Sequence, residues 1–496
     1  MAKRLSILLC IALLAACFSA ELSASAETKF AFTPDAAIQK QLDSYAELKA
    51  QLTANAPIAD IQKKYVADFE ANIAPIDAAI SADNPKIHES INQVLTLVGE
   101  GKLVYGQANE AIQKGLLWYF YFLSKDLLNK QAKPALEKGD AVAAKAALDK
   151  VVQIYVGELQ SFVTKRDAAF KTLMTDLLDN VVFPALQADV ANKDVAQFNL
   201  HRQMFDKTMI KAFSLATIRY GNIMSTVAPD KQPAEITEAY FLYMPVYVYL
   251  KGGSPVDADY IRDAFGSGDA ANIDGAKISH AFARTLIGKV GEYTLKSIDG
   301  VKQGTDASVT AMEGIMFIAA TETLVKEKLG EAAYQTAAAE GQAYFEAIVA
   351  KDAKAAEAHA FNAVRELAKL DGAQFKVGSK NLLVNNVAAT ADAASYVDAK
   401  TNRTLVPLRF VKQALGADIS FDNATKTVTV TNDAGGKIEI AIGSADVKIN
   451  GEVSADKKLE QPALIKDNFT YVPIRAISEL LEYGVYFQKG EVVVIR

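Results

Sequence analysis

Four histidines are the residues of this chain whose type and position best suit chemistry. Each falls in the first turns of a predicted helix, shortly after a turn that contains Asp. Imidazole binds metal ions and haem iron, and side chains from facing helices can meet inside a helical bundle. The histidines could therefore converge on a metal ion or haem, with Glu89 or Glu357 as an additional ligand. The four candidates are His88, His201, His280 and His359.

The alternative interpretation of these histidines is structural. His201 shares one helical face with Phe198 and Phe205, which is typical of a histidine packed in a core. The His-Ala-Phe sequences at His280 and His359 indicate a repeat more than a metal site. We favour the structural interpretation, so no metal and no cofactor is predicted, and iron or haem binding is kept as the alternative.

Local sequence motifs of enzymes are missing from the chain. It contains no HExxH, CxxCH, nucleophile elbow, phosphate-binding loop or closely spaced pair of catalytic carboxylates. We therefore predict no catalytic residue and expect a protein that is not an enzyme. A hydrolase is kept open as a third possibility, because a large helical domain can assemble a site from residues that are distant in sequence.

Length and charge narrow the possible classes of protein. With 496 residues the chain is too long for one ordinary domain, so two or three domains are expected. Its 53 basic and 59 acidic residues give a net charge of −6, and no long basic run is present. A chain of this charge lacks the positive surface that phosphate backbones require, so nucleic acid is not an expected partner.

The first 26 residues have the pattern of an export signal. Lys3 and Arg4 precede an apolar run of 12 residues, and Ala24-Ser25-Ala26 is a suitable cleavage site. We predict a signal peptide at 1–26 and an extracytoplasmic, secreted or envelope-associated protein. Leu14-Ala15-Ala16-Cys17 also resembles a lipoprotein processing site, so Cys17 is a candidate for lipidation and the only predicted link to a membrane.

Residues 27–372 are predicted to form an all-α region built of helical hairpins. Apolar residues recur at intervals of three and four, as in Ile38, Leu42, Tyr45 and Leu48. Short polar turns that carry Asp separate the predicted helices, and an Asp or Asn in each turn can accept hydrogen bonds from the first amides of the next helix. These residues are Asp83, Asp140, Asp194, Asp269 and Asp352.

Two aromatic runs, GLLWYFYFL around Trp118 and AYFLYMPVYVYL around Tyr243, interrupt the polar pattern of this region. They could line a ligand groove. Aromatic residues on every side of a helix are more typical of a helix buried at the centre of a large domain, and we favour that interpretation. The tyrosine hydroxyl groups of such helices would need hydrogen-bond partners.

After a predicted linker at 373–379, residues 380–496 consist of short alternating runs that predict strands and hairpins. Within this region, TLVPLRFVKQALGADISF from Thr404 and TYVPIRAISELLEYGVYF from Thr470 are two versions of one segment, 66 residues apart. Each predicts a strand that ends in Val-Pro, a short helix and a second strand, with Phe421 and Phe487 at equivalent apolar positions. The sequence predicts a small α+β domain with an internal duplication.

The doubled segment resembles the copper amine oxidase N-terminal-like, or stalk, domain of secreted Gram-positive bacterial proteins. The resemblance covers roughly the last 115 residues and includes Leu415 to Ala417, Ile442 to Ser444 and Asn450-Gly451. It implies an accessory domain without oxidase chemistry, and residues 380–496 contain no His that could ligate copper. The structural motif residues are Val406, Pro407, Arg409, Val472, Pro473 and Arg475.

Arg409 and Arg475 could contact a carboxylate or a glycan, but we favour internal salt bridges for both. In the helical region, EKGDAVAAKAALDKVVQIYVGEL is similar to hairpins of extracytoplasmic domains attached to bacterial iron permeases. EGIMFIAATE, which begins at Glu313, is reminiscent of the iron motif of those permeases but lacks its neighbouring Arg and second Glu.

These observations predict a multidomain, exported and non-enzymatic cell-envelope protein. Its large all-α domain would bind a ligand or partner, such as a cell-wall component or another protein, and its stalk-like domain would support or anchor it. The alternative is an extracytoplasmic protein that binds metal, iron or haem for uptake.

Overall fold

The computed structural model describes residues 31–431, 436–481 and 483–495. The predicted signal peptide and Cys17 lie outside these residues. The chain forms two compact units. The first extends to Lys251 and includes Asp257–Phe282, and the second contains Gly252–Val256 and the chain from Ala283 onward.

The first unit is helical. Continuous helices are formed where α-helical segments join through π-helical turns, as α6 and α7 do through η2 (Leu127–Ala132). The helices are α2 (Ala36–Thr53), α3 (Ile58–Tyr65), α4 (Ala71–Ala79), α5 (Ile87–Gly99), α6 (Tyr105–Asp126), α7 (Lys133–Glu137), α8 (Ala141–Ile154), α9 (Gln160–Phe170), α10 (Met174–Leu177), α11 (Phe183–Asn192), α12 (Val195–Ile223), α13 (Gln232–Lys251) and α14 (Pro255–Gly266). The remaining short turns are η1 (Val66–Glu70), η3 (Tyr155–Leu159), η4 (Leu178–Val182), η5 (Met224–Thr226) and η6 (Ala270–Asn272).

Most of the predicted Asp residues cap helices. Asp140 accepts a hydrogen bond from the Ala143 amide at 2.9 Å at the start of α8, and Asp194 begins α12 in the same way. Asp352 caps α19 (Ala353–Leu367), and Asp269 caps the short turn η6. The prediction for Asp83 is wrong, because α5 begins at Ile87 and its first amides donate to Asp77 instead.

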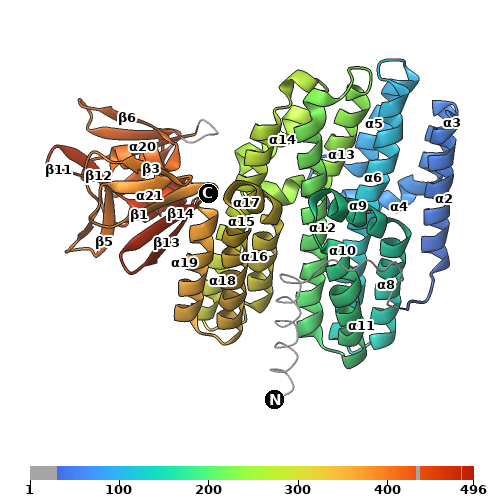
Figure 1. Ribbon diagram of the computed structural model, residues 1–496, viewed down its shortest axis with the longest axis horizontal. Coiled ribbons are helices and arrows are strands. Elements are labelled where there is room, and N and C mark those ends of the chain that lie inside the picture. The colour runs from blue at the N-terminus through green and yellow to red at the C-terminus, as the bar shows by residue number, and fades with distance from the viewer. Residues whose placement is uncertain (1–30, 432–435, 482, 496) are drawn as a thin grey trace. The chain divides into compact units, whose positions relative to one another are not determined.

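The core of the first unit is built around α6, α12 and α13, which lie side by side (Figure 1). Trp118 and its neighbours Tyr119, Phe120 and Tyr121 are all buried in α6, and Tyr243 is buried in α13. The interpretation of the aromatic runs as buried helices is confirmed.

The buried tyrosine hydroxyl groups of these helices have partners, as expected. Tyr121 donates to the Asp206 carboxylate at 2.8 Å, and Tyr119 donates to the Gln41 side chain at 2.8 Å. Tyr243 donates to the carbonyl oxygen of Ala258 at 2.9 Å.

The second unit combines helices with the strand-rich C-terminal region. Helix α15 (Gly275–Lys302) begins in the first unit and ends in the second. It is followed by α16 (Ser308–Ala320), α17 (Glu322–Leu329) and the hairpin of α18 (Glu331–Val349) and α19. The predicted layout of helical hairpins followed by a small α+β region is confirmed.

The C-terminal region contains three antiparallel sheets. Their strand orders are β13-β14-β1-β2-β3, β10-β9-β8-β7-β6 and β11-β12-β5-β4. The strands are β1 (Gly372–Lys376), β2 (Asn381–Val384), β3 (Val387–Thr390), β4 (Tyr396–Asp398), β5 (Arg403–Pro407), β6 (Asp418–Asp422), β7 (Thr427–Thr431), β8 (Lys437–Ala441), β9 (Asp446–Ile449), β10 (Glu452–Lys458), β11 (Leu464–Lys466), β12 (Phe469–Pro473), β13 (Gly484–Gln488) and β14 (Glu491–Ile495).

The two copies of the doubled segment pair with each other. Strands β5 and β12 are antiparallel, and Val406 lies opposite its equivalent Val472. Each strand leads directly into a short helix, α20 (Leu408–Leu415) or α21 (Ile474–Leu480), and both helices contact the strands (Figure 1). The duplication therefore forms two halves that meet at one strand pair and share one hydrophobic core.

The segment predicted as a linker, 373–379, contains most of β1. This strand is central in its sheet, between β14 and β2, so its backbone hydrogen bonds are used and it cannot act as a free connection. Gln374 also donates to the carbonyl oxygen of Arg365 at 2.7 Å, and Tyr486 on β13 hydrogen-bonds the Thr294 hydroxyl at 2.6 Å. The boundary between the two compact units therefore lies earlier in the chain than the point where helices give way to strands.

Among the described helices, none taken singly combines the length and the apolar character that a membrane span requires. Only α16 and α17 together, bent by 44° at their junction, meet that criterion of length and composition.

Candidate functional site

The structure gives His88, His201 and His359 separate partners on helical segments that come earlier in the chain than their own. His201 on α12 lies 2.5 Å from the Asp189 carboxylate on α11, measured from Nδ1, and both side chains are buried. Burial raises the pKa of Asp189, and the hydrogen bond to His201 counteracts this rise. Nδ1 of His359 on α19 likewise lies 2.8 Å from the Glu340 carboxylate on α18.

His88 on α5 contacts two earlier segments: its Nδ1 lies 3.2 Å from the Tyr65 hydroxyl at the end of α3, and its Nε2 lies 3.5 Å from Glu70 at the end of η1. His280 lies exposed on α15. Within the described parts of the chain, no three His, Cys, Asp or Glu side chains are grouped so that they could hold a metal ion. The histidines with these partners join their own helices to earlier segments instead of surrounding a common centre.

The other candidates of the helical region are also placed by the structure. Glu313 is buried in α16, and Glu89 and Glu357 lie on α5 and α19. Glu357 forms an ion pair of 2.6 Å with Lys302.

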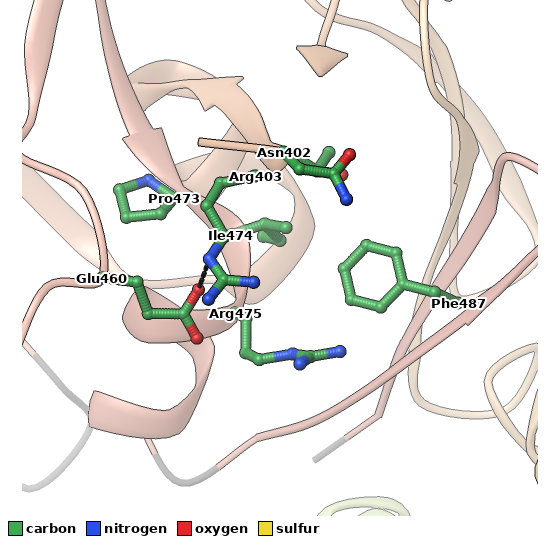
Figure 2. A pocket seen from close by; sticks show the side chains of 8 residues that line it. Asn402, Arg403, Glu460, Pro473, Ile474, Arg475 and Phe487 are labelled. Atoms are coloured by element: carbon green, nitrogen blue, oxygen red, sulfur yellow. Dashed lines mark ion pairs between the residues drawn. The ribbon is translucent and has the colours of Figure 1, made fainter. Parts of the chain in front are cut away.

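A pocket of about 130 Å³ lies in the C-terminal region (Figure 2). It forms where the start of β5 lies beside the end of β12, because the two strands are antiparallel and β12 turns into α21 at this point. Phe487 from β13 forms the opposite wall. The lining residues are Asn402, Arg403, Thr404, Glu460, Pro473, Ile474, Arg475 and Phe487.

Arg475 is the cation of this pocket for which the described residues show no ion pair. Its guanidinium carbon lies 5.1 Å from the centre of the Phe487 ring, which is 37% exposed. Among the described residues, no carboxylate forms an ion pair with Arg475, although Glu479, one turn further along α21, interacts with it electrostatically. The described residues therefore do not form the internal salt bridge that was predicted for Arg475.

The second arginine of the pocket is paired. Arg403 Nε contacts the Glu460 carboxylate, and Figure 2 shows this ion pair on the side of the pocket opposite Phe487. Two guanidinium groups and one carboxylate line the pocket, so its lining residues carry one net positive charge. The pocket therefore attracts an anionic group.

The first copy of the doubled segment lacks this arrangement. Arg409, equivalent to Arg475, points into solvent with 80% of its side chain exposed and pairs with Asp392 at 2.7 Å. Phe469 occupies the position equivalent to Arg403, and Ala394 the position equivalent to Glu460. The predicted salt bridge is therefore found for Arg409, and only the second copy concentrates charge around its arginine.

The remaining motif residues have structural roles. Val406 and Val472 are fully buried in the core, and Pro407 and Pro473 are the residues immediately before the first turns of α20 and α21. The sequence did not reveal Phe487 as a pocket residue, because its position in the doubled segment is equivalent to that of Phe421, which packs against the core. Comparison of the two copies at Arg403 and Phe469 was the signal that could have indicated the site.

A pair of carboxylates that the sequence did not reveal lies between α6 and α13. Lys114 Nζ lies 3.1 Å from Glu238 and 3.4 Å from Glu110. Burial, together with the negative charge of Glu238, raises the pKa of Glu110 to about 7, although Lys114 opposes the rise. The cluster carries two acids for one base and is expected to make the stability of the first unit depend on pH.

Replacing Glu110 by Gln should stabilise the protein above neutral pH and have little effect below about pH 5. The raised pKa means that the folded state binds this proton more tightly than the unfolded state. The stability that protonated Glu110 contributes is therefore lost as pH rises through about 7. At about pH 8 we expect a gain of about 1–3 kcal/mol in the free energy of unfolding, measured by urea denaturation. Glu137→Gln on the exposed face of α7 is the control, and it should change the free energy of unfolding by less than about 0.5 kcal/mol at either pH. Equal effects of Glu110→Gln at both pH values would contradict the assignment.

Comparison with known proteins concerns the C-terminal region. Residues 373–495 match the family model of the copper amine oxidase N-terminal domain, and no family model matches the helical region. No curated protein and no solved structure matches the chain. The matched residues contain neither His nor Cys, so the ligands that copper prefers are missing from them. The resemblance inferred from the doubled segment is confirmed: residues 373–495 form a copper amine oxidase N-terminal-like domain.

Proposed function

We propose that this chain is an exported, non-enzymatic binding protein of the cell envelope of a Gram-positive bacterium. Its helical hairpins bind a partner, and its C-terminal domain anchors it by holding a component of the envelope. The observation that carries this proposal is the pocket around Arg475, which carries one net positive charge and offers a guanidinium beside the exposed ring of Phe487.

Several features support a binding function over catalysis. The family matched by the C-terminal region is an accessory domain and not a catalytic one. Arg475 and Arg403 are charged binding groups, and neither is a nucleophile or a general acid at ordinary pH. The separate partners of His88, His201 and His359 favour packing roles over a shared metal, which places the uptake of iron or haem second.

The N-terminal sequence supports export. Residues 1–26 have a charged start, an apolar run and a small-residue cleavage site, and Cys17 offers a second route to the envelope through lipidation. In either case the mature chain would meet the cell wall, where a C-terminal binding domain could hold it.

Sedimentation with isolated cell walls tests the proposal. The full mature chain, incubated with walls of a Gram-positive bacterium, should appear in the pellet and approach saturation as its concentration is raised. The double variant Arg403→Ala/Arg475→Ala should bind at least about tenfold more weakly, because each contact of a charged group contributes about 1.5–3 kcal/mol. A wild-type chain that stays in the supernatant at every concentration would overturn the anchoring function.

A further inference from the structure

We infer that the pocket around Arg475 binds a carboxylate-bearing sugar unit. This inference rests on the proposed function and names the chemical class of ligand that the pocket would hold.

The charges of the pocket select an anion of low charge. Arg403 and Arg475 outnumber Glu460 by one, which favours a single negative charge. A doubly charged phosphate would bring its second charge close to the Glu460 carboxylate, and like charges repel strongly at such distances. A monoanion matches the pocket better.

Each guanidinium group has a contact within the protein before a ligand arrives. Glu460 engages Nε of Arg403 and restrains the orientation of its planar group (Figure 2). Phe487 supports Arg475 from the side at 5.1 Å. Planar guanidinium groups match the two oxygens of a planar carboxylate, and groups that are already ordered lose less entropy on binding.

The walls of the pocket suit a ring that carries hydroxyl groups. Phe487, Pro473 and Ile474 offer apolar surface, against which the C–H face of a sugar can lie. Asn402 and Thr404 line the same space with side-chain groups that donate and accept hydrogen bonds. A volume of about 130 Å³ is suited to one sugar unit and not to an extended polymer, so the remainder of a glycan would lie outside.

Arginine-detected NMR of the full mature chain tests this inference with glucuronate as the probe. Glucuronate should shift the Nε–Hε signals of Arg403 and Arg475, and glucose, which lacks the carboxylate, should leave them unchanged. Arg475→Lys keeps the charge but loses the planar guanidinium group that can donate two hydrogen bonds to one carboxylate, so it should weaken glucuronate binding at least about fivefold. Arg409→Ala is the matched control from the other copy and should change the affinity less than about twofold.

Three results would overturn the inference. They are the absence of any shift with glucuronate, a stronger response to inorganic phosphate, and an equal response to N-acetylalanine, which carries a carboxylate without a sugar ring. If the chain still sediments with cell walls in such a case, the ligand class is wrong and the anchoring function stands. If wall binding fails while glucuronate binds at Arg475, the anchoring function is wrong and the site is retained.

Discussion

Replacing Asp206 by Asn is expected to lower the free energy of unfolding of the first unit by about 3–5 kcal/mol. The Asp206 carboxylate on α12 is buried between Lys207 Nζ at 2.7 Å and Lys125 Nζ at 3.0 Å, and it accepts the Tyr121 hydroxyl at 2.8 Å. Burial alone would raise the pKa of Asp206, but the two ammonium groups outweigh it and hold that pKa well below its usual range. The substitution removes the negative charge while Lys207, only 2% exposed, stays in the core.

The single tryptophan of the chain makes this effect measurable. Trp118 is buried one turn before Tyr121 on α6, so its fluorescence during urea denaturation reports on the surroundings of Asp206. Asp126→Asn is the matched control. Asp126 lies on α6, like Trp118, and forms a more exposed ion pair with Lys130, which should contribute less than about 1 kcal/mol to the free energy of unfolding. Similar losses in both variants would contradict the role given to the buried cluster.

Asp206 should also make the unit sensitive to acid. A carboxylate whose pKa is lowered by folding contributes stability that is present above its unfolded pKa and is lost as pH falls below it. The variant should therefore lose less stability than the wild type when the pH is lowered below about 4.

Replacing Gly288 by Ala is expected to destabilise the second unit by about 3 kcal/mol or more. A Cβ atom on Gly288 in α15 would lie 2.1 Å from the carbonyl oxygen of Gly253, and one on Gly253 would lie 2.0 Å from the carbonyl oxygen of Thr285. Both obstacles are backbone atoms, which cannot turn away as a side chain can. The helix and the segment at 253 would have to separate.

Gly314→Ala provides the control for this prediction. Gly314 also lies inside a helix, α16, but its added Cβ would meet its nearest neighbours at an ordinary 3.5 Å. Because Ala favours the helix over Gly by about 0.5–1 kcal/mol, this variant should unfold at the same or a higher temperature in far-ultraviolet circular dichroism. If Gly288→Ala unfolds at the wild-type temperature, the close backbone approach is not required.

The features that were predictable from the sequence are those set by local rules. The doubled Val-Pro segment predicted strand and helix in each copy, because Pro407 and Pro473 and the apolar spacing after them act within a few residues. The caps at Asp140, Asp194 and Asp352 were predictable for the same reason.

The features that were missed depend on contacts between residues far apart in the chain. Asp77, ten residues before Ile87, caps α5, whereas local spacing favours Asp83. Lys114 gathers Glu110 and Glu238 from two helices, and no local spacing reveals that pair. Phe487 has the sequence pattern of a core strand residue, and only its position beside Arg475 shows that it lines a pocket.

The most direct test of the central claim is the affinity of two single variants, Arg475→Ala and Arg409→Ala, for isolated cell walls. The two arginines occupy equivalent positions of the duplicated segment, yet only Arg475 lines the pocket, and Arg409 is paired with Asp392 at the surface. We predict that Arg475→Ala binds walls about tenfold or more weakly than the wild type, whereas Arg409→Ala binds within about twofold of it. Equal affinities of the two variants would contradict the assignment of the pocket as the binding site.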